Sequence, residues 1–239
     1  QKYKLVKIYA NIINHSLRMW DYTSAQRVDY FIANSEETRA RIQKFYRRDA
    51  VVIYPPVKIP KRFVNSIKNK NSYYITVSRI ARVKHIDLLI KCANKFKINL
   101  KIVGQGRDLV YLKEIAGDTI ELVEQADDTK LQNLLSGAKA FLFAAVDEEF
   151  GIAPVEAMGQ GIPVIAYSSG GLKETVKDQE NGFLYNDLTI DSLAQQIRKL
   201  EAMSDDKYLE MRESAYRESK KYSEENFKKN ILTYLQKIT

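Results

Sequence analysis

The stretch AFLFAAVDEEFGIAPVEAMGQGIPV, residues 140–164, decides the fold of this chain. It begins with a nearly continuous apolar run at 140–144, which is typical of a central strand buried on both faces. A turn at Gly151 follows, and Pro154 lies near the first turn of a predicted helix at 153–160, where proline is favoured. Strand, tight turn and helix together form the repeating unit of an α/β protein.

The turn between this strand and this helix is suited to an anion. Free backbone N–H groups and the positive end of a helix point toward the mouth of the strand, and a phosphate is their natural occupant. Glu148 stands before the turn and Glu156 lies eight residues later, inside the helix. Two carboxylates beside a phosphate make sense if they accept hydrogen bonds from sugar hydroxyls. Taken alone, the pair is better explained as an exposed loop acid and a helix-surface charge.

The same alternation extends over the rest of the chain from residue 72 onward. Strands are predicted at 74–77, 100–103, 120–123, 140–143, 164–166 and 182–185, with helices at 86–96, 107–116, 128–136, 153–160 and 171–177. After Asp187 the chain is predicted to be helical to its end. Strands alternating with helices predict an α/β fold, a Rossmann-like parallel sheet with helices on both faces. In such a sheet, ligands bind at the carboxyl ends of the strands near a topological switch point.

The amino-terminal part has a different pattern. A basic amphipathic helix is predicted at 3–20, followed by short strands at 28–33 and 50–54 with a polar helix between them. The helix at 3–20 is explained either by packing against a domain that this chain lacks or by contact with an acidic membrane. We therefore divide the chain into a fragment at 1–57, a linker at 58–71 and a complete domain at 72–239.

Composition sets broad limits on function. The net charge of +8 favours anionic partners and leaves nucleic acid, acidic lipid and phosphorylated small molecules open. No aromatic–basic interleaving typical of RNA-binding surfaces is present, so no nucleic-acid partner is expected. No His, Cys or carboxylate set has metal-ligand spacing. The single cysteine, Cys92, fits a reducing compartment, and we expect a cytoplasmic protein whose targeting information is missing.

Two segments carry a resemblance to a known family. Glu148 and Glu156, with FGI at 150–152 and GIPV at 161–164, resemble the E-x7-E signature of retaining glycosyltransferases of family 4, also called glycosyl transferases group 1. VSRI at 77–80, followed by Lys84 and DLLI at 87–90, resembles the family's segment G-R-L-x-x-x-K-G-x-D-L-L-I.

The match departs from the family pattern at several positions and has one further element. Ser78 and His85 replace glycines, and Glu149 stands where glycine is frequent. Ala153-Pro154 replaces a commoner Pro-x order, and Glu124 stands where the family has a small residue. VGQG at 103–106 resembles the family's V-G-x-G turn.

The resemblance implies a fold and a reaction. The chain looks like the carboxyl-terminal, donor-binding half of a GT-B fold, with 1–57 as a remnant of the acceptor-side domain and the last helices crossing back toward it. Transfer would retain the sugar's configuration and need no metal or other cofactor. Arg79 and Lys84 would hold the donor diphosphate and stabilise its departure, and Glu148 would contact the hexose hydroxyls.

The resemblance also places the remaining contacts to the nucleotide sugar. Glu156 would bind the ribose, and the base would lie near Val123 and Glu124. The other donor-binding residues are Gly104, Phe150, Gly151 and Ile152, the last three acting through backbone N–H groups.

Within the family the chain looks most like mannosyltransferases of polysaccharide assembly, so GDP-mannose is the expected donor and a glycan or lipid-linked molecule the expected acceptor. We expect this chain alone to bind donor without turnover, and peripheral contact with the cytoplasmic face of a membrane stays open. Two alternatives remain: another GT-B enzyme, such as a phosphorylase or sugar-nucleotide epimerase, and a non-catalytic basic scaffold protein.

Overall fold

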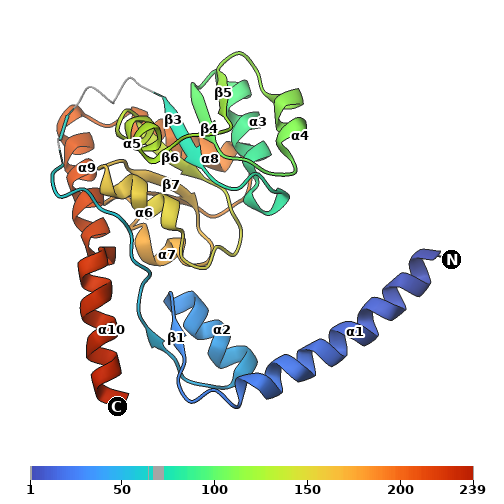
Figure 1. The fold of residues 1–239 in the computed structure, drawn as a ribbon. Coiled ribbons are helices and arrows are strands. Elements are labelled where there is room, and N and C mark those ends of the chain that lie inside the picture. The colour runs from blue at the N-terminus through green and yellow to red at the C-terminus, as the bar shows by residue number, and fades with distance from the viewer. Residues whose placement is uncertain (1, 64, 67–72, 239) are drawn as a thin grey trace. The chain divides into compact units, whose positions relative to one another are not determined.

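The computed structural model describes residues 2–63, 65–66 and 73–238, and the chain divides into two compact units, residues 1–53 and 54–239 (Figure 1). The first unit contains α1 (Lys2–Ala25), β1 (Ile32–Ala33), α2 (Glu36–Tyr46) and β2 (Val51–Val52). β1 and β2 pair in parallel. The hydroxyl of Ser35 accepts the N–H of Thr38 at 3.0 Å and so caps α2.

The helix and strands of this first unit end at other residues than the sequence predicts. α1 continues to Ala25 rather than ending at residue 20, because no glycine or proline interrupts it. The strands predicted at 28–33 and 50–54 shrink to two residues each, Ile32–Ala33 and Val51–Val52, with hydrogen bonds that also involve Phe31 and Ile53. The side chains of Leu5 and Ile8, which belong to the predicted apolar stripe, lie outside the described part of the chain.

The second unit is built on a six-stranded parallel sheet of order β5-β4-β3-β6-β7-β8. Its strands are β3 (Tyr74–Val77), β4 (Leu100–Val103), β5 (Ile120–Val123), β6 (Ala140–Phe143), β7 (Val164–Tyr167) and β8 (Gly182–Tyr185). The predicted parallel α/β sheet is confirmed. Every strand matches its predicted range except β7, which is one residue longer.

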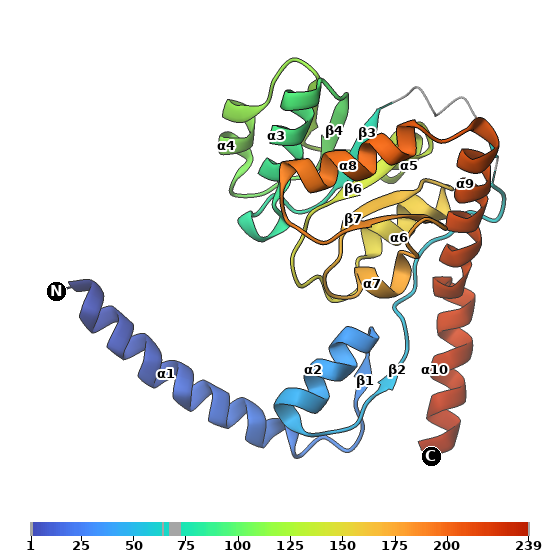
Figure 2. The same ribbon diagram turned by 180° about the vertical axis from the view of Figure 1, so that it is seen from behind.

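Helices cover both faces of this sheet, as Figures 1 and 2 show from opposite sides. One face carries α3 (Ile86–Phe96), α4 (Leu109–Ile115) and α8 (Ile190–Glu201), and the other α5 (Asp128–Ser136), α6 (Ile152–Gly159) and α7 (Leu172–Thr175). Alternation along β6 supplies both cores, since Leu142 packs in the first and Phe141 in the second. α9 (Asp205–Ser219) contributes Tyr208 to the first core and Ala215 to the second, and α10 (Glu224–Ile238) ends the chain.

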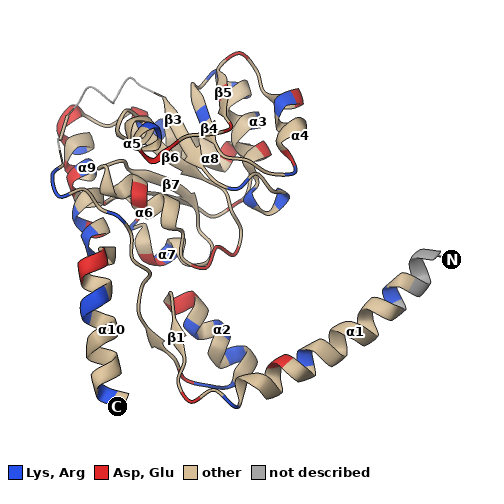
Figure 3. Cartoon of the chain, viewed as in Figure 1, with Lys and Arg blue, Asp and Glu red and all other residues tan. Residues whose placement is uncertain are grey.

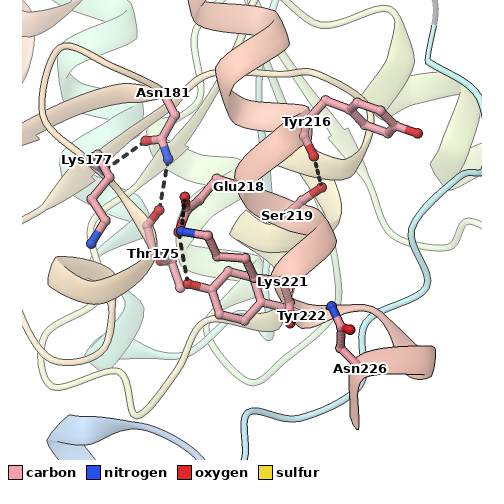
Figure 4. A network of polar contacts seen from close by, with 9 residues as sticks. All are labelled: Thr175, Lys177, Asn181, Tyr216, Glu218, Ser219, Lys221, Tyr222 and Asn226. Carbon is pink, nitrogen blue, oxygen red and sulfur yellow. Dashed lines mark hydrogen bonds and ion pairs between the residues drawn. The ribbon is translucent and has the colours of Figure 1, made fainter. Parts of the chain in front are cut away.

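α7 is shorter than the helix predicted at 171–177, and the side chain of Asn181 explains why. Its amide donates to the carbonyl of Thr175 at 3.0 Å and accepts the N–H of Lys177 at 2.8 Å (Figure 4). These two hydrogen bonds satisfy the backbone at the helix end, so the helix stops at Thr175.

The stretch predicted as a linker at 58–71 packs on the second unit where it is described. Val57 donates its N–H to the carbonyl of Tyr222 at 2.8 Å. Phe63 stacks on Tyr216 with ring centroids 4.9 Å apart, and the hydroxyl of Tyr216 donates to the carbonyl of Pro60 at 2.9 Å. Residues 64 and 67–71 of the predicted linker lie outside the described residues.

Positive charge is distributed over many elements rather than gathered in one patch (Figure 3). This distribution is typical of a solvated surface. Among the described residues, no helix combines the length and the apolar character needed to cross a bilayer.

We predict that the central strand carries a large share of the stability of the second unit. Leu142→Ala, at a side chain only 1% exposed, should lower the free energy of unfolding by about 2–5 kcal/mol in urea denaturation. Leu232→Ala is the matched control, because Leu232 on α10 is 59% exposed and its loss should cost about 0.5 kcal/mol or less. Equal losses for the two variants would contradict the assignment of β6 as the buried centre.

Candidate functional site

The candidate site lies at the topological switch point of the sheet. β3 pairs with β6 at its centre, β4 and β5 continue to one side, and β7 and β8 to the other. The loops that leave β3 and β6 therefore begin at neighbouring carboxyl ends of the sheet, which is where ligands bind in folds of this kind. The first loop carries Arg79 and Lys84, and the second carries Glu148.

An ion pair joins the two loops across the switch point. Nζ of Lys84 lies 2.5 Å from Oε2 of Glu148, and the two side chains are 20% and 22% exposed. Lys84 ends a short 3₁₀ helix, Arg82–Lys84, and His85 then turns the chain into α3 with a φ of 47°. The family glycine that His85 replaces is explained by this left-handed backbone, which glycine adopts most readily. The structure thus brings together two side chains predicted to serve the same site.

The backbone of the Glu148 turn is fixed by the loop that follows β7. Asp147 donates its N–H to Oγ of Ser169 at 2.9 Å, and Gly171 donates its N–H to the carbonyl of Glu148 at 2.8 Å. Gly170 has a φ of 57°, and a Cβ built there would lie 2.0 Å from the carbonyl oxygen of Glu148. Only glycine allows so close an approach of two backbones.

α6 begins where this turn ends. Gly151 is its N-cap with a φ of 89°, and the helix runs from Ile152 to Gly159. The N–H groups of the first turn have no carbonyl partner within the helix, which leaves them available to an anion. Phe150 is buried at 3% exposure, whereas Ile152 is 48% exposed.

The ends of β3, β4 and β5 form the adjoining part of the site. Ser78 donates its N–H to the carbonyl of Val103 at 3.0 Å, and Gly104 donates to the carbonyl of Val123 at 3.0 Å. A Cβ on Gly104 would lie 2.0 Å from the carbonyl oxygen of Ser78, which is the physical reason for glycine in this turn. Arg79 follows Ser78 in this turn and is exposed.

Two acidic residues of the predicted site have distinct surroundings. Glu156 lies in the second turn of α6, and its pKa is raised first by burial and second by the negative charge of Asp128 on α5. Glu124, the residue after β5, forms an ion pair with Lys113 of α4. The acid that replaces the family's small residue beside the predicted base position is therefore charge-paired.

Three features of the site were missed from the sequence. They are the Lys84–Glu148 ion pair, the hydroxyl of Ser169 and the contact of Gly170 and Gly171 with the Glu148 turn. The sequence SSGG at 168–171, directly after a predicted strand, was the available signal, because adjacent glycines at a strand end indicate a close backbone approach.

Comparison with known proteins places this site in context. The profile of the family described as glycosyl transferases group 1 matches residues 57–221. The GtfA subunit of a UDP-N-acetylglucosamine–peptide N-acetylglucosaminyltransferase from Streptococcus pneumoniae is 29% identical over 196 residues, covering 73% of this chain and 38% of that protein. The alpha-1,3/1,6-mannosyltransferase ALG2 of Dictyostelium discoideum is 28% identical over 170 residues, covering 59% of this chain and 40% of that protein.

Solved structures show the same fold. Sucrose-phosphate synthase from Thermosynechococcus elongatus superposes with a TM-score of 0.81 at 20% identity, covering 94% of this chain and 62% of that one. Pneumococcal GtfA in complex with UDP and GlcNAc superposes with a TM-score of 0.75 at 23% identity, covering 92% of this chain and 47% of that one. The chain spans less than half the length of the GtfA relatives that it matches.

We predict that the Glu148 turn depends on glycine at position 170. Gly170→Ala should lower the melting temperature strongly, because a left-handed alanine costs about 1–3 kcal/mol before the overlap with the Glu148 carbonyl is relieved. Gly137→Ala is the control, since its φ is −84° and its added Cβ meets the movable end of the Tyr73 side chain. A smaller loss for Gly170→Ala than for Gly137→Ala in thermal unfolding would contradict this geometry.

The raised pKa of Glu156 predicts a pH dependence of stability. The folded chain holds the Glu156 proton above the ordinary pKa of 4.5, so burying the ionised carboxylate costs stability as pH rises through the raised value. Glu156→Gln removes this cost and should therefore gain stability relative to wild type as pH increases from 4.5. Urea denaturation of both proteins across this pH range measures the difference, and a constant or shrinking advantage of the variant would disprove it.

Proposed function

Because the chain belongs to the glycosyl transferases group 1 family, we propose that it binds the donor of an enzyme that transfers a hexose, with retention, from a nucleoside diphosphate sugar. The observation that supports this proposal is the meeting of Lys84, Glu148 and the amino end of α6 at the switch point of the sheet. Cationic, acidic and backbone N–H groups at one edge of the sheet match a ligand that carries both phosphates and sugar hydroxyls.

The diphosphate has two sources of positive potential at this place. The N–H groups at the start of α6 carry the positive end of the helix dipole, and Lys84 and Arg79 approach from the loop after β3. As the bond to the sugar breaks, negative charge grows on the departing diphosphate, and fixed positive groups stabilise it. Balancing this charge with side chains is the basis for our proposal that no metal takes part.

Glu148 supplies the contact to the sugar in this proposal. Its ionised carboxylate can only accept hydrogen bonds, and it pairs with Lys84. When the diphosphate attracts Lys84, Glu148 becomes available to the hexose hydroxyls. Glu156, whose ionised form is disfavoured by burial, gains from a hydroxyl donor, and we assign it to the ribose.

We propose GDP-mannose as the donor and a glycan or lipid-linked molecule as the acceptor. Mannosyltransferase relatives support mannose, whereas the GtfA relatives are named for UDP-N-acetylglucosamine, which is therefore the competing donor. Acceptor binding and turnover are assigned to the remainder of a longer enzyme, because the chain spans less than half the length of the GtfA relatives. Exposed apolar side chains on α1, such as Ile12, Leu17 and Trp20, are suited to packing against that remainder.

The proposal predicts donor binding that depends on Lys84. Saturating nucleotide at about 100 times its dissociation constant should stabilise the wild-type chain by about 2.7 kcal/mol, which a thermal-shift titration detects. GDP, GDP-mannose, UDP and UDP-N-acetylglucosamine are compared, and GDP-mannose is expected to give the largest shift. Lys84→Ala should lose most of the shift.

Lys91→Ala is the matched control, because Lys91 on α3 pairs with Asp87 on the helix surface and its loss should leave every shift unchanged. A preference for the uridine ligands would keep the glycosyltransferase and reject GDP-mannose. No shift with any of the four ligands would reject donor binding by this chain.

A further inference from the structure

Three aromatic rings pack against one another directly behind the Glu148 turn. The ring centroids of Tyr54 and Phe150 are 5.7 Å apart, those of Phe150 and Tyr222 are 5.2 Å apart, and those of Tyr54 and Tyr222 are 5.1 Å apart. Both contacts of Tyr222 have the edge-on geometry that aromatic quadrupoles favour. Together with Val57 and Val155 these rings form an apolar cluster separate from the two cores of the sheet, here called the aromatic cluster.

The aromatic cluster gathers three stretches that are distant in sequence. Tyr54 is the first residue of the second unit, Phe150 precedes the N-cap of α6, and Tyr222 lies just before α10. The entering and leaving stretches are also tied to each other, since the N–H of Val57 donates to the carbonyl of Tyr222 at 2.8 Å. The aromatic cluster therefore links both ends of the second unit to the loop after β6.

Tyr54 has a second tie to the site. Its hydroxyl lies 3.2 Å from Oε2 of Glu174 on α7, the helix that follows Gly171. Gly171 in turn holds the carbonyl of Glu148. Tyr54 is thus linked to the turn in two ways. Its ring packs on Phe150, and its hydroxyl contacts α7, which directly follows Gly171.

Tyr222 acts chiefly through its ring. Its hydroxyl lies 3.5 Å from the carboxylate of Glu218 on α9, at the limit of a hydrogen bond, and Figure 4 shows the two side chains facing each other. The ring itself is 4% exposed and covers Phe150. Phenylalanine at this position keeps the ring and removes only the weak contact.

Phe150 has little freedom while its two partners are in place. It stands two residues after Glu148 and one before Gly151, so the position of its ring sets the direction of the turn that connects them. Binding sites of this kind need supporting residues that hold the contacting groups within a fraction of an ångström. Residues 147–149 are acidic and none of them is buried, so Phe150 is the apolar anchor of this turn.

We propose that Tyr54 and Tyr222 are positioning residues for the donor site: by holding the ring of Phe150, they aim Glu148 and the first N–H groups of α6 at the nucleoside diphosphate sugar. This inference rests on the proposed function for the identity of the ligand. It adds two residues that make no contact with the donor in this proposal and lie outside the segments 77–90 and 148–164.

The test uses the 239-residue chain with Tyr222→Leu, Tyr222→Phe, Tyr54→Leu and Tyr54→Phe. Donor affinity is measured by isothermal titration calorimetry well below each melting temperature, so that only folded protein contributes. Both leucine variants should bind the donor about tenfold more weakly, as expected when contacting groups are displaced, and Tyr222→Phe should restore wild-type affinity within about twofold. Tyr54→Phe keeps the ring but loses the hydroxyl contact with Glu174, so its affinity should fall between those of Tyr54→Leu and the wild type. In ¹H–¹⁵N spectra without ligand, the amide resonance of Gly151 should move in the leucine variants and stay in place in Tyr222→Phe.

Phe183→Leu is the matched control for a purely structural role. Phe183 is 4% exposed on β8 and belongs to the first core, away from the aromatic cluster. This variant should lower the melting temperature without changing donor affinity or the Gly151 amide. Leucine variants that are destabilised but bind donor like wild type and leave the Gly151 amide unmoved would overturn the positioning role. Absence of donor binding by wild type would reject the proposed function instead, and the Gly151 amide would then decide alone whether the aromatic cluster positions the turn.

Discussion

The pairing of β3 with β6 is the constraint on which the site depends. Parallel pairing of Tyr74 with Ala140 and of Ile75 with Phe141 places two strands side by side that are separated by two complete strand–helix units. Because all six strands run in the same direction, the loops after β3 and β6 leave at the same edge of the sheet. The first loop leads to α3 on one face and the second to α6 on the other. The two loops begin side by side because of this order, and the Lys84–Glu148 ion pair joins them.

Close backbone contacts then fix the loops at this edge of the sheet. Gly104 lies against the carbonyl of Ser78, and Gly170 against the carbonyl of Glu148, in each case at a distance that a side chain would prevent. The first contact sets the loop that carries Arg79, and the second sets the turn before α6. In the proposed function, backbone held by these contacts lowers the cost of ordering the groups that bind the donor.

Most of the fold was predictable from the sequence because each strand is a short apolar run with clear limits. Residues 140–143 are buried on both faces, and their predicted and observed bounds agree. Strand order was not predictable, since residue patterns do not say which strands are neighbours. The spacing of Glu148 and Glu156 indicated a candidate site. The ion pair of Glu148 with Lys84 and the rings of Tyr54 and Tyr222 join residues too distant in sequence for any spacing to reveal.

A crystal structure of the chain with a bound nucleoside diphosphate tests the central claim most directly. We expect the terminal phosphate to lie at the amino end of α6, within hydrogen-bond distance of the backbone N–H groups of residues 151–152. Nζ of Lys84 should then have turned from Glu148 to a phosphate oxygen. A diphosphate bound elsewhere would contradict it, for example in the hollow of about 750 Å³ between α8 and α9, where Lys199, Lys207 and Arg217 supply positive charge. In that case the switch point would not be the donor site.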